Sequence, residues 1–382
     1  MTLRQFASRL GRRMRPAPAR PIGVDFAASR LNLVQAELQG ERWHLRAAAS
    51  LAYPMPREAL LAAPRELLRF VDAALKLAPF QGRRVVAALA PADVRILPLT
   101  VQVGQGQSEA QAVARAAAEQ LGERAAQHVI DYYQVRGADM DGGERQVLLA
   151  AAPRERVLDT LAMLESARLT PMALDIGPAA IGRLLATLHG SDVGQSVALL
   201  NFGAARSYLT VIWGRRLMLD REIAFGEEML AGAVAAALDL PPATASNLLR
   251  EHGIGARGTP AAGAQDASGD GAADAAARGE LRRAIRTILH PACQALADEL
   301  AHTQVYVASR TRGSSISRLY LNGSLAHYPD IAERIGELID VPVHLLAPLG
   351  AFPLSRPDAV ATGAAASVAL ATGLALRGGA DG

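Results

Sequence analysis

Two stretches of the chain share one order of apolar and polar positions, 176 residues apart. Residues 25–30 and residues 201–206 each follow a short apolar run and precede a strand-like one. A turn containing Gly40 or Gly214 then leads into a further strand-like run. Each copy therefore predicts three strands joined by tight turns. We expect two similar lobes, each with its first turn facing a shared cleft.

A different pattern separates the two copies. It predicts strands over 85–99, a helix over 108–121, paired strands over 128–135 and 146–152, and a helix over 154–167. Pro91 and Pro98 are expected to break the first of these segments, and Ser108 is placed to cap the first helix. The order strand-helix-strand-strand-helix predicts a subdomain inserted into the first lobe.

Beyond the second copy, helical and strand-like segments alternate. They predict helices over 226–238, 243–252, 280–311 and 328–339, and strands over 318–321 and 343–345, with a turn over 322–324. Residues 256–279 contain nothing apolar larger than alanine, which predicts a disordered surface loop. The small residues of 359–376 predict a helix capped by Asp358. Their weak hydrophobicity favours packing inside the protein over a membrane span.

The N-terminal segment, residues 1–20, is basic and amphipathic, with apolar residues three and four apart and arginines between them. Two interpretations stay open: docking on an anionic membrane face, or a solvated, frayed terminus. The segment has no apolar run long enough for a signal peptide, so export is not expected. Removing its six arginines from the net charge of +3 leaves −3 on the rest of the chain. Nucleic-acid binders carry a basic stripe on the folded domain, so we expect no nucleic-acid partner.

These motifs, in this order and spacing, resemble the actin/Hsp70/sugar-kinase superfamily and, within it, the PilM family of type IV pilus assembly proteins. Segments 22–34 and 201–210 resemble the first and second phosphate loops, and 319–324 resembles the adenosine loop. The inserted segment is similar to the extra subdomain of the PilM and FtsA proteins. The resemblance implies an α/β fold: a two-lobed actin/Hsp70-like (ribonuclease H-like) duplicated fold with an FtsA/PilM-type inserted subdomain.

The same resemblance divides the chain into regions. We expect a basic tail over 1–20, a first lobe over 21–82 completed by 165–194 and by a C-terminal helix over 358–377, an inserted subdomain over 83–164, and a second lobe over 195–357 that contains the loop 256–279.

The resemblance also implies a site for ATP and Mg²⁺. In such folds, turn N–H groups bind phosphates, and carboxylates at strand ends hold Mg²⁺ through water. Asp25 matches the metal-binding carboxylate. The expected cofactor-binding positions are Asp25, Ala27, Ala28, Ser29, Asn32, Asn201, Gly203, Ala204, Ala205, Gly226, Gly323 and Ser324.

Three departures weaken this expectation. Asn201 replaces the usual second aspartate, Asn32 replaces a lysine or similar polar residue, and Ser324 replaces an adjacent glycine after Gly323. We therefore expect weak ATP binding or none, and no efficient hydrolysis, because charge stabilisation and water positioning carry most phosphoryl transfer. No catalytic residue is assigned.

A purely structural interpretation also stays open for these positions. Asp25 and Asn201 are suited to cap turns, and Gly203, Gly226 and Gly323 to serve backbone geometry alone. Other chemistry is not indicated, since the chain has no Gly-Lys pair of a Walker A loop and its eight histidines show no metal-ligand spacing.

By resemblance, we expect a cytoplasmic adaptor, peripheral to the inner membrane. It would bind the N-terminal peptide of a PilN-like inner-membrane protein in a groove by the inserted subdomain, and so couple the platform to the pilus assembly motor. Three alternatives stay open: an active ATPase or small-molecule kinase of the same superfold, an FtsA-like division protein, and a platform protein of a related secretion or mannose-sensitive pilus system. FtsA proteins carry their amphipathic helix at the C-terminus, whereas the amphipathic segment here is N-terminal.

Overall fold

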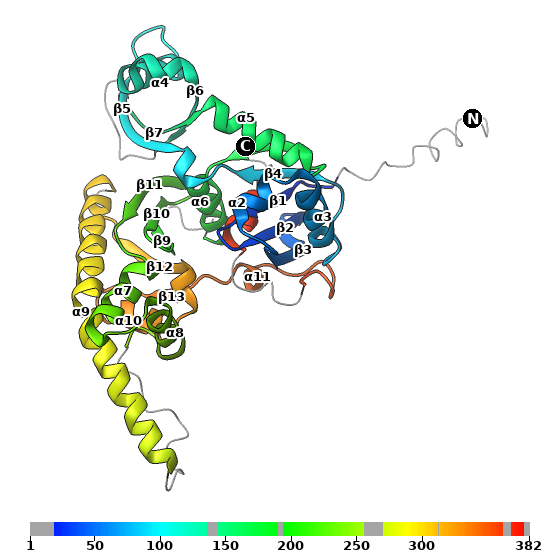
Figure 1. Ribbon diagram of the computed structural model, residues 1–382. Coiled ribbons are helices and arrows are strands. Elements are labelled where there is room, and N and C mark those ends of the chain that lie inside the picture. Colours follow the sequence, from blue (N-terminus) through cyan, green and yellow to red (C-terminus); the bar gives the residue numbers. More distant parts are fainter. Residues whose placement is uncertain are drawn as a thin grey trace, which may run out of the picture.

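The computed structural model describes residues 19–135, 144–189, 194–255, 270–311, 313–361 and 368–377, with side chains from residue 276 onward in the helix that begins at Asp270. In this part of the chain, the strands form two five-stranded sheets and one three-stranded sheet. The two larger sheets form the centres of two lobes, and the small sheet lies at one end of the molecule (Figure 1).

The first lobe is built on a sheet with the strand order β3-β2-β1-β4-β8. Its strands are β1 (Ile22–Phe26), β2 (Arg30–Gln39), β3 (Arg42–Ala52), β4 (Arg84–Ala88) and β8 (Thr170–Asp175). Strands β1, β2 and β3 pair antiparallel, whereas β4 runs parallel to β1 and β8 parallel to β4. The C-terminal ends of β1, β4 and β8 therefore share one edge, where ligands bind in open α/β sheets.

The second lobe repeats this arrangement, with the strand order β11-β10-β9-β12-β13. Its strands are β9 (Ser196–Phe202), β10 (Ser207–Trp213), β11 (Arg216–Ile223), β12 (Ile316–Gly323) and β13 (Val343–Leu345). Asp25 pairs with Asn32 across β1 and β2, and Asn201 pairs with Tyr208 at the same spacing across β9 and β10. The predicted duplication is confirmed.

Helices cover the sheets and join the lobes. In the first lobe and between the lobes they are α2 (Arg57–Leu61), α3 (Pro64–Leu75), α5 (Arg154–Ser166), α6 (Gly177–Leu188) and α12 (Ala369–Ala375). Those of the second lobe are α7 (Glu227–Leu238), α8 (Pro242–His252), α9 (Asp270–Arg310), α10 (Ile331–Gly336) and α11 (Pro348–Ala351).

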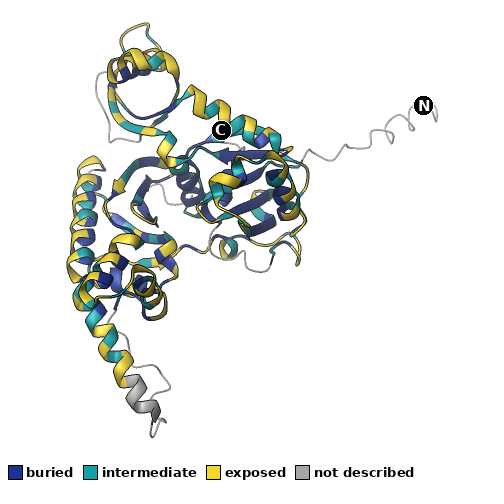
Figure 2. Cartoon of the chain, in the orientation of Figure 1, coloured by how far each residue is buried: buried dark blue, intermediate teal, exposed yellow. Residues whose placement is uncertain are grey.

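The lobes share one apolar cluster. Val34 of the first sheet and Val197 of the second belong to it, together with Leu184 of α6 and Ala371 of α12. Figure 2 shows the strands mostly buried and the outer faces of the helices exposed. This joint core holds the two lobes together, because apolar burial is the main favourable contribution to folding.

The inserted subdomain has the predicted order of elements. These are β5 (Arg95–Gln102), α4 (Glu109–Leu121), β6 (His128–Gln134) and β7 (Glu144–Pro153), followed by α5, with the strands in the order β5-β7-β6. Ser108 caps α4 as predicted, in a capping box with Gln111.

Two details of this region differ from the prediction. Pro98 does not break its strand, because β5 is an edge strand, where a missing N–H is tolerated. Strand β4, which the expected boundary at residue 83 assigns to the insertion, pairs with β1 in the first sheet. Pro91 opens a 3₁₀ turn, η1 (Pro91–Asp93), which leads from β4 into the insertion.

The C-terminal helix is shorter than the predicted 359–376, and Asp358 does not cap it. The amide of Ala48 donates to the carbonyl of Ala359 at 2.7 Å, and the amide of Ala361 donates to that of Ala48 at 2.9 Å. Because β3 is an edge strand with unpaired backbone groups, it pairs with this segment. The helix α12 begins at Ala369, and residues 362–367 lie outside the described ranges.

Two other predicted segments also differ. Residues 270–279, expected in a loop, belong to α9, since this alanine-rich stretch has high helix propensity; residues 256–269 lie outside the described part of the chain. The helix predicted over 328–339 is the shorter α10, which begins after Asp330, a residue with left-handed backbone at φ +57°. Pro329 also disfavours helical backbone at Tyr328. A 3₁₀ turn, η3 (Ser324–His327), precedes it.

No helix within the described ranges is both long and apolar enough to cross a membrane. The predicted tail lies outside those ranges as far as residue 18.

Candidate functional site

Asp25 ends strand β1 and is held by a chain of hydrogen bonds across the sheet. Asn32 on β2 donates through Nδ2 to Asp25 Oδ2 at 3.0 Å. The hydroxyl of Ser50 on β3 donates to Asn32 Oδ1 at 2.6 Å, and Asn32 is fully buried. The buried amide has both a donor and an acceptor partner, so it fixes the direction of the carboxylate.

The environment of Asp25 disfavours its charged form. Burial raises the pKa of Asp25 to about 6, against the opposing effects of the hydrogen bond from Asn32 and the positive charge of Arg57. A cation at this site would favour the carboxylate and release a proton on binding. Asp25 is therefore a carboxylate whose protonation is sensitive to a nearby charge.

Arg57 was missed by sequence reasoning. It begins helix α2, and its Nε donates to the carbonyl of Phe26 at 3.1 Å, directly after Asp25. The only sequence signal is an arginine at a helix start, which has no special meaning alone. In the fold, it brings a cation to the first turn, where Asn32 replaces the expected lysine.

The first turn, residues 27–29 between β1 and β2, is held from one side. The hydroxyl of Tyr53 donates to the carbonyl of Ala27 at 3.0 Å, and the amide of Tyr53 donates to that of Ser29 at 3.1 Å. Ala28 and Ser29 are exposed. Their backbone and the Ser29 hydroxyl are accessible to a ligand on the open side of the turn.

The second-lobe residues form a compact group. Asn322 on β12 donates through Nδ2 to Asn201 Oδ1 at 2.8 Å. A Cβ on Gly226 would lie 2.4 Å from the carbonyl oxygen of Ala204, so only glycine permits this approach. Gly323 has φ +94°, and a Cβ there would lie 2.1 Å from the carbonyl oxygen of Phe202. A Cβ at either glycine would meet protein backbone, which supports the interpretation that these glycines serve backbone geometry.

The second turn is bound to the start of α7. The amide of Glu227 donates to the carbonyl of Gly203 at 3.3 Å, and the amide of Glu228 donates to that of Ala204 at 2.9 Å. Helix N-termini bind anions through such first-turn amides. Here two of them already have partners within the turn, while Ala204 and Ala205 themselves are exposed.

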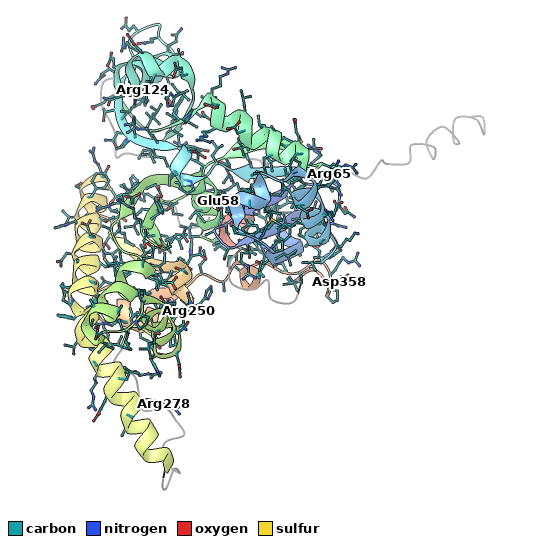
Figure 3. The ribbon with its side chains drawn as sticks, in the orientation of Figure 1. Glu58, Arg65, Arg124, Arg250, Arg278 and Asp358 are labelled. Atoms are coloured by element: carbon teal, nitrogen blue, oxygen red, sulfur yellow. The ribbon has the colours of Figure 1, made fainter. Side chains whose placement is uncertain are left out.

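A polar cluster beside Ser324 was not predicted. The hydroxyl of Tyr328 donates to Glu227 Oε1 at 2.6 Å, and Arg250 donates to the same oxygen at 2.8 Å. Burial opposes ionisation of Glu227, but hydrogen bonds from Tyr328, Arg250 and Ser324 outweigh it and hold the pKa of Glu227 below its ordinary value. Arg250 lies on α8 in the second lobe (Figure 3). The cluster joins α7, α8 and the expected adenosine loop.

The structure thus gathers the predicted positions into two groups. In the described part of the chain, no hydrogen bond or ion pair joins the Asp25 group to the Asn201 group, and no three acidic, histidine or cysteine side chains form a metal cluster. The residues fit a Mg²⁺–phosphate group in part. Asp25 and Arg57 supply one carboxylate and one guanidinium to the cavity beside the first turn, whereas the amide of Asn201 in the second lobe is bound to Asn322.

Two cavities lie where the inserted subdomain joins the first lobe. The larger, of 590 Å³, extends from Asp25 between α2, η1 and α5, and the smaller, of 120 Å³, lies between β6, β7 and the end of β8. Leu89, directly after β4, lines both. Together we call them the junction groove, whose further lining includes Arg57, Leu61, Arg156, Thr160 and Met163 in the larger cavity and Val94, Val129, Tyr133, Ala152 and Val157 in the smaller.

A buried carboxylate anchors the smaller cavity. Asp175 has a fully buried side chain and forms ion pairs with Arg183 at 2.9 Å and with Arg377 at 3.0 Å. Arg183 belongs to α6 and Arg377 follows α12. Charges desolvated in this way need partners, so Asp175 fixes the relative positions of β8 and both interlobe helices.

The sequence was compared with profiles of known protein families, and one family matches. The sequence profile described as "Type IV pilus assembly protein PilM" matches residues 23–257. No curated protein sequence matches the chain.

Solved structures share the architecture. The PilM–PilN type IV pilus biogenesis complex matches with a TM-score of 0.69 and 22% identity, over 94% of this chain and 99% of that one. The ethanolamine utilization protein EutJ from Carboxydothermus hydrogenoformans matches with a TM-score of 0.48 and 13% identity, over 95% and 91%. MreB5 of Spiroplasma citri bound to ADP matches with a TM-score of 0.41 and 10% identity, over 86% and 92%. The first likeness shows the fold, and the other two are too distant to carry an argument.

Proposed function

Because this chain belongs to the PilM family of type IV pilus assembly proteins, we propose that it acts as an actin-like adaptor in the inner-membrane platform of the pilus and not as an efficient enzyme. Its partner is the cytoplasmic N-terminal peptide of a PilN-like membrane protein. The observation that carries the proposal is the junction groove beside the inserted subdomain.

The junction groove suits an extended peptide. Its two cavities share the lining residue Leu89, with apolar walls from Leu61 and Met163 in the larger and Val129 in the smaller. Extended peptides bind through main-chain hydrogen bonds and place alternate side chains into such pockets. The solved relative in this fold is a complex of PilM with PilN, which supports the choice of partner.

Charged side chains border the larger cavity. Arg156 lies 3.7 Å from Asp93 and 3.8 Å from Asp159, and Arg57 lies 3.8 Å from Glu58. These pairs are exposed or partly exposed and contribute little to stability. They are available to orient a peptide by exchanging partners with its charged groups.

ATP binding is proposed to be weak and to depend on Asp25. At the first turn, Asp25 supplies a negative charge when ionised and Arg57 supplies a positive one. Asn201 supplies no charge and is already bound to Asn322. Mg²⁺ usually keeps several waters and uses one or two carboxylates plus phosphates. A single carboxylate is therefore sufficient for binding but leaves the water-positioning needed for hydrolysis incomplete.

We place the protein on the cytoplasmic face of the inner membrane, where its partner's peptide would emerge. There it would couple that peptide to the pilus assembly motor. The family membership and the groove support this placement; the motor contact is an extension of it.

The test is a calorimetric titration of the full-length protein with the N-terminal peptide of the PilN-like protein from the same organism, with and without Mg²⁺·ATP. A scrambled peptide serves as the control, and phosphate release is measured on the same samples. Saturable binding of the native peptide without turnover supports the adaptor. Absence of peptide binding together with rapid phosphate release would replace it with an ATPase or kinase.

A further inference from the structure

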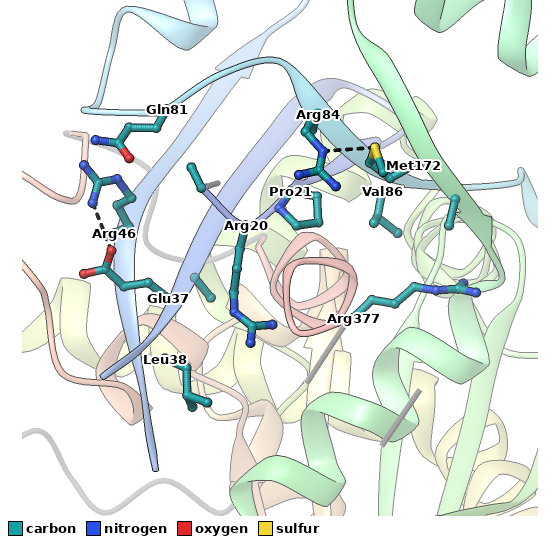
Figure 4. Close-up of a pocket in the computed structure, with 13 residues that line it drawn as sticks. Arg20, Pro21, Glu37, Leu38, Arg46, Gln81, Arg84, Val86, Met172 and Arg377 are labelled. Carbon is teal, nitrogen blue, oxygen red and sulfur yellow. Dashed lines mark hydrogen bonds and ion pairs between the residues drawn. The ribbon is translucent and has the colours of Figure 1, made fainter. Parts of the chain in front are cut away.

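A second large cavity, of 820 Å³, lies at the end of the first sheet away from Asp25 (Figure 4). Its walls come from Pro21 before β1, the start of β4, and the late part of β2. These positions are neighbours because β2 runs antiparallel to β1 and β4 runs parallel to it. The cavity contains none of the predicted nucleotide positions and shares one lining residue, Arg377, with the junction groove. We call it the basic pocket.

The lining of the basic pocket is strongly cationic. Four arginines line it, against a single carboxylate; the arginines are Arg20, Arg46, Arg84 and Arg377, and the carboxylate is Glu37. Arg46 pairs with Glu37 at 2.9 Å, and Figure 4 shows this pair on one side of the pocket with Arg84 on the other. After that pairing, the pocket keeps an excess of positive charge.

Arg84 is the clearest source of this excess. It is exposed, and its Nε lies 3.1 Å from the sulfur of Met172. Within the described ranges, no carboxylate lies within ion-pair distance of its guanidinium. A guanidinium offers several donors in a planar fork that matches phosphate and carboxylate oxygens.

Arg377 and Arg20 extend the charge around the opening. Arg377 shares the buried Asp175 with Arg183, so two guanidinium groups face one carboxylate. The guanidinium of Arg20 lies over the ring of Trp43, 4.7 Å from its centroid, which holds this residue at the pocket. The carbonyl of Arg20 also accepts a bond from Gln35 at 2.7 Å.

Two further features indicate a surface as the ligand. Residues 1–20, with six arginines and no acidic residue, lead directly into the pocket wall at Arg20. Leu38 and Met172 line the pocket with 40% and 46% of their surface exposed. Arginines beside exposed apolar side chains are typical of surfaces that rest on a bilayer interface.

We propose that the basic pocket binds the phosphate headgroup of an anionic phospholipid and, with the basic tail, seats the first lobe on the membrane. Arg84 contacts the phosphate, Leu38 and Met172 face the acyl boundary, and the tail adds non-specific attraction. A soluble acidic protein segment would satisfy the arginines but not the apolar rim, so the membrane is the better match. The inference needs no peptide partner and stands apart from the proposed function.

The experiment is co-sedimentation of the full-length protein with vesicles of phosphatidylglycerol and phosphatidylcholine, and with vesicles of phosphatidylcholine alone. Arg84→Glu is the test variant. Arg65→Glu is the matched control. Arg65 is exposed on α3 (Figure 3), and α3 packs on the face of the first sheet opposite to the face of the pocket residues Ala36 and Val86. Circular dichroism and thermal melting of each variant confirm that it is folded.

The proposal predicts binding to the anionic vesicles only, weakened by salt. Arg84→Glu should lower the partition coefficient at least about fivefold, the effect of one basic residue near the surface, while Arg65→Glu leaves it close to wild type. Glycerol 3-phosphate should compete poorly, because it lacks the bilayer. Equal losses in the two variants would overturn the pocket in favour of diffuse charge. Tight binding of glycerol 3-phosphate or of a polyglutamate peptide, without vesicle binding, would overturn the membrane as the ligand.

Discussion

The hydroxyl of Tyr133 donates a hydrogen bond to Asp175 Oδ1 at 3.1 Å, and so ties strand β6 of the inserted subdomain to the end of β8 in the first lobe. The next residue, Gln134, accepts a bond from Arg216 of β11 at 3.5 Å, and Val135 packs against the core of the second lobe. One short stretch of the insertion therefore touches both lobes. Tyr133 also lines the smaller cavity of the junction groove, so this stretch joins the groove to both lobes.

The first prediction concerns this contact. Tyr133→Phe should lower the free energy of unfolding by about 1 kcal/mol, because it removes one donor from a buried carboxylate that keeps its arginine partners. Urea denaturation measures the change. Tyr306→Phe is the control, since Tyr306 lies on α9 and is partly exposed. Equal stability of the two variants would show that the Tyr133 bond is not formed in solution.

The second prediction concerns the pH dependence caused by Asp25. Its pKa rises from 3.8 to about 6 on folding, so the folded state resists losing this proton. The stabilising contribution of the protonated group is complete below about pH 4 and is lost as the pH rises through about 6. Asp25→Asn, which keeps an acceptor for Asn32, should therefore raise the free energy of unfolding near pH 7 by about 1–3 kcal/mol, with little gain near pH 4.

A second carboxylate with a raised pKa, Asp220, serves as the control that distinguishes an effect on stability from an effect on ligand binding. Burial also raises the pKa of Asp220 to about 6, against a hydrogen bond from Thr210 at 2.7 Å. Asp220→Asn should show the same pH-dependent gain, whereas only Asp25→Asn should reduce Mg²⁺·ATP binding. A loss of stability in Asp25→Asn near pH 7 would contradict the assignment of its protonation.

The third prediction tests the missing charge at Asn201. Asn201→Asp keeps an oxygen acceptor for Asn322 and adds a carboxylate at the end of β9, the strand that corresponds to β1. The affinity for Mg²⁺·ATP should rise, on the order of tenfold, as ligand charge is restored. Calorimetry measures the affinity, with Asn247→Asp on the exposed side of α8 as the control. Unchanged affinity would place the defect at the loop that follows Gly323.

The fourth prediction concerns the close approach at Gly226. Gly226→Ala would place a Cβ 2.4 Å from the carbonyl oxygen of Ala204, so the second turn must move. We expect a loss of about 1–3 kcal/mol in the free energy of unfolding. Gly232→Ala is the control, because Gly232 is exposed within α7 and a Cβ there meets nothing within 4 Å. That change should stabilise the protein by about 0.5–1 kcal/mol. Two similar values would show that the turn is looser than the structure indicates.

The repeat around Asp25 and Asn201 was readable from the sequence because strand, turn and strand follow one another locally. The same local logic identified the capped helix at Ser108 and the order of elements in the insertion. Contacts between distant segments were not readable. The bond between Asn201 and Asn322 joins residues 121 positions apart, and no local pattern records such a pairing.

The remaining differences also have tertiary causes. Residues 359–361 pair with β3 because that edge strand has unpaired backbone groups, which overrides the helical pattern of the segment. Arg57 and the Glu227 cluster acquire their roles only when α2, α7 and α8 are packed beside the turns. The sequence therefore indicates the two halves of the nucleotide positions but not the side chains that neighbour them.

The most direct test of the adaptor is binding of the PilN-like peptide, labelled for fluorescence anisotropy, to variants of the junction groove. Thr160→Arg adds bulk and charge in the larger cavity, and Val129→Arg does so in the smaller. Ala162→Arg is the control, since Ala162 is exposed on the same helix as Thr160 and lines neither cavity. The account predicts that wild type and Ala162→Arg bind alike, and that at least one groove variant loses about tenfold in affinity or more. Wild-type affinity in both groove variants would contradict it.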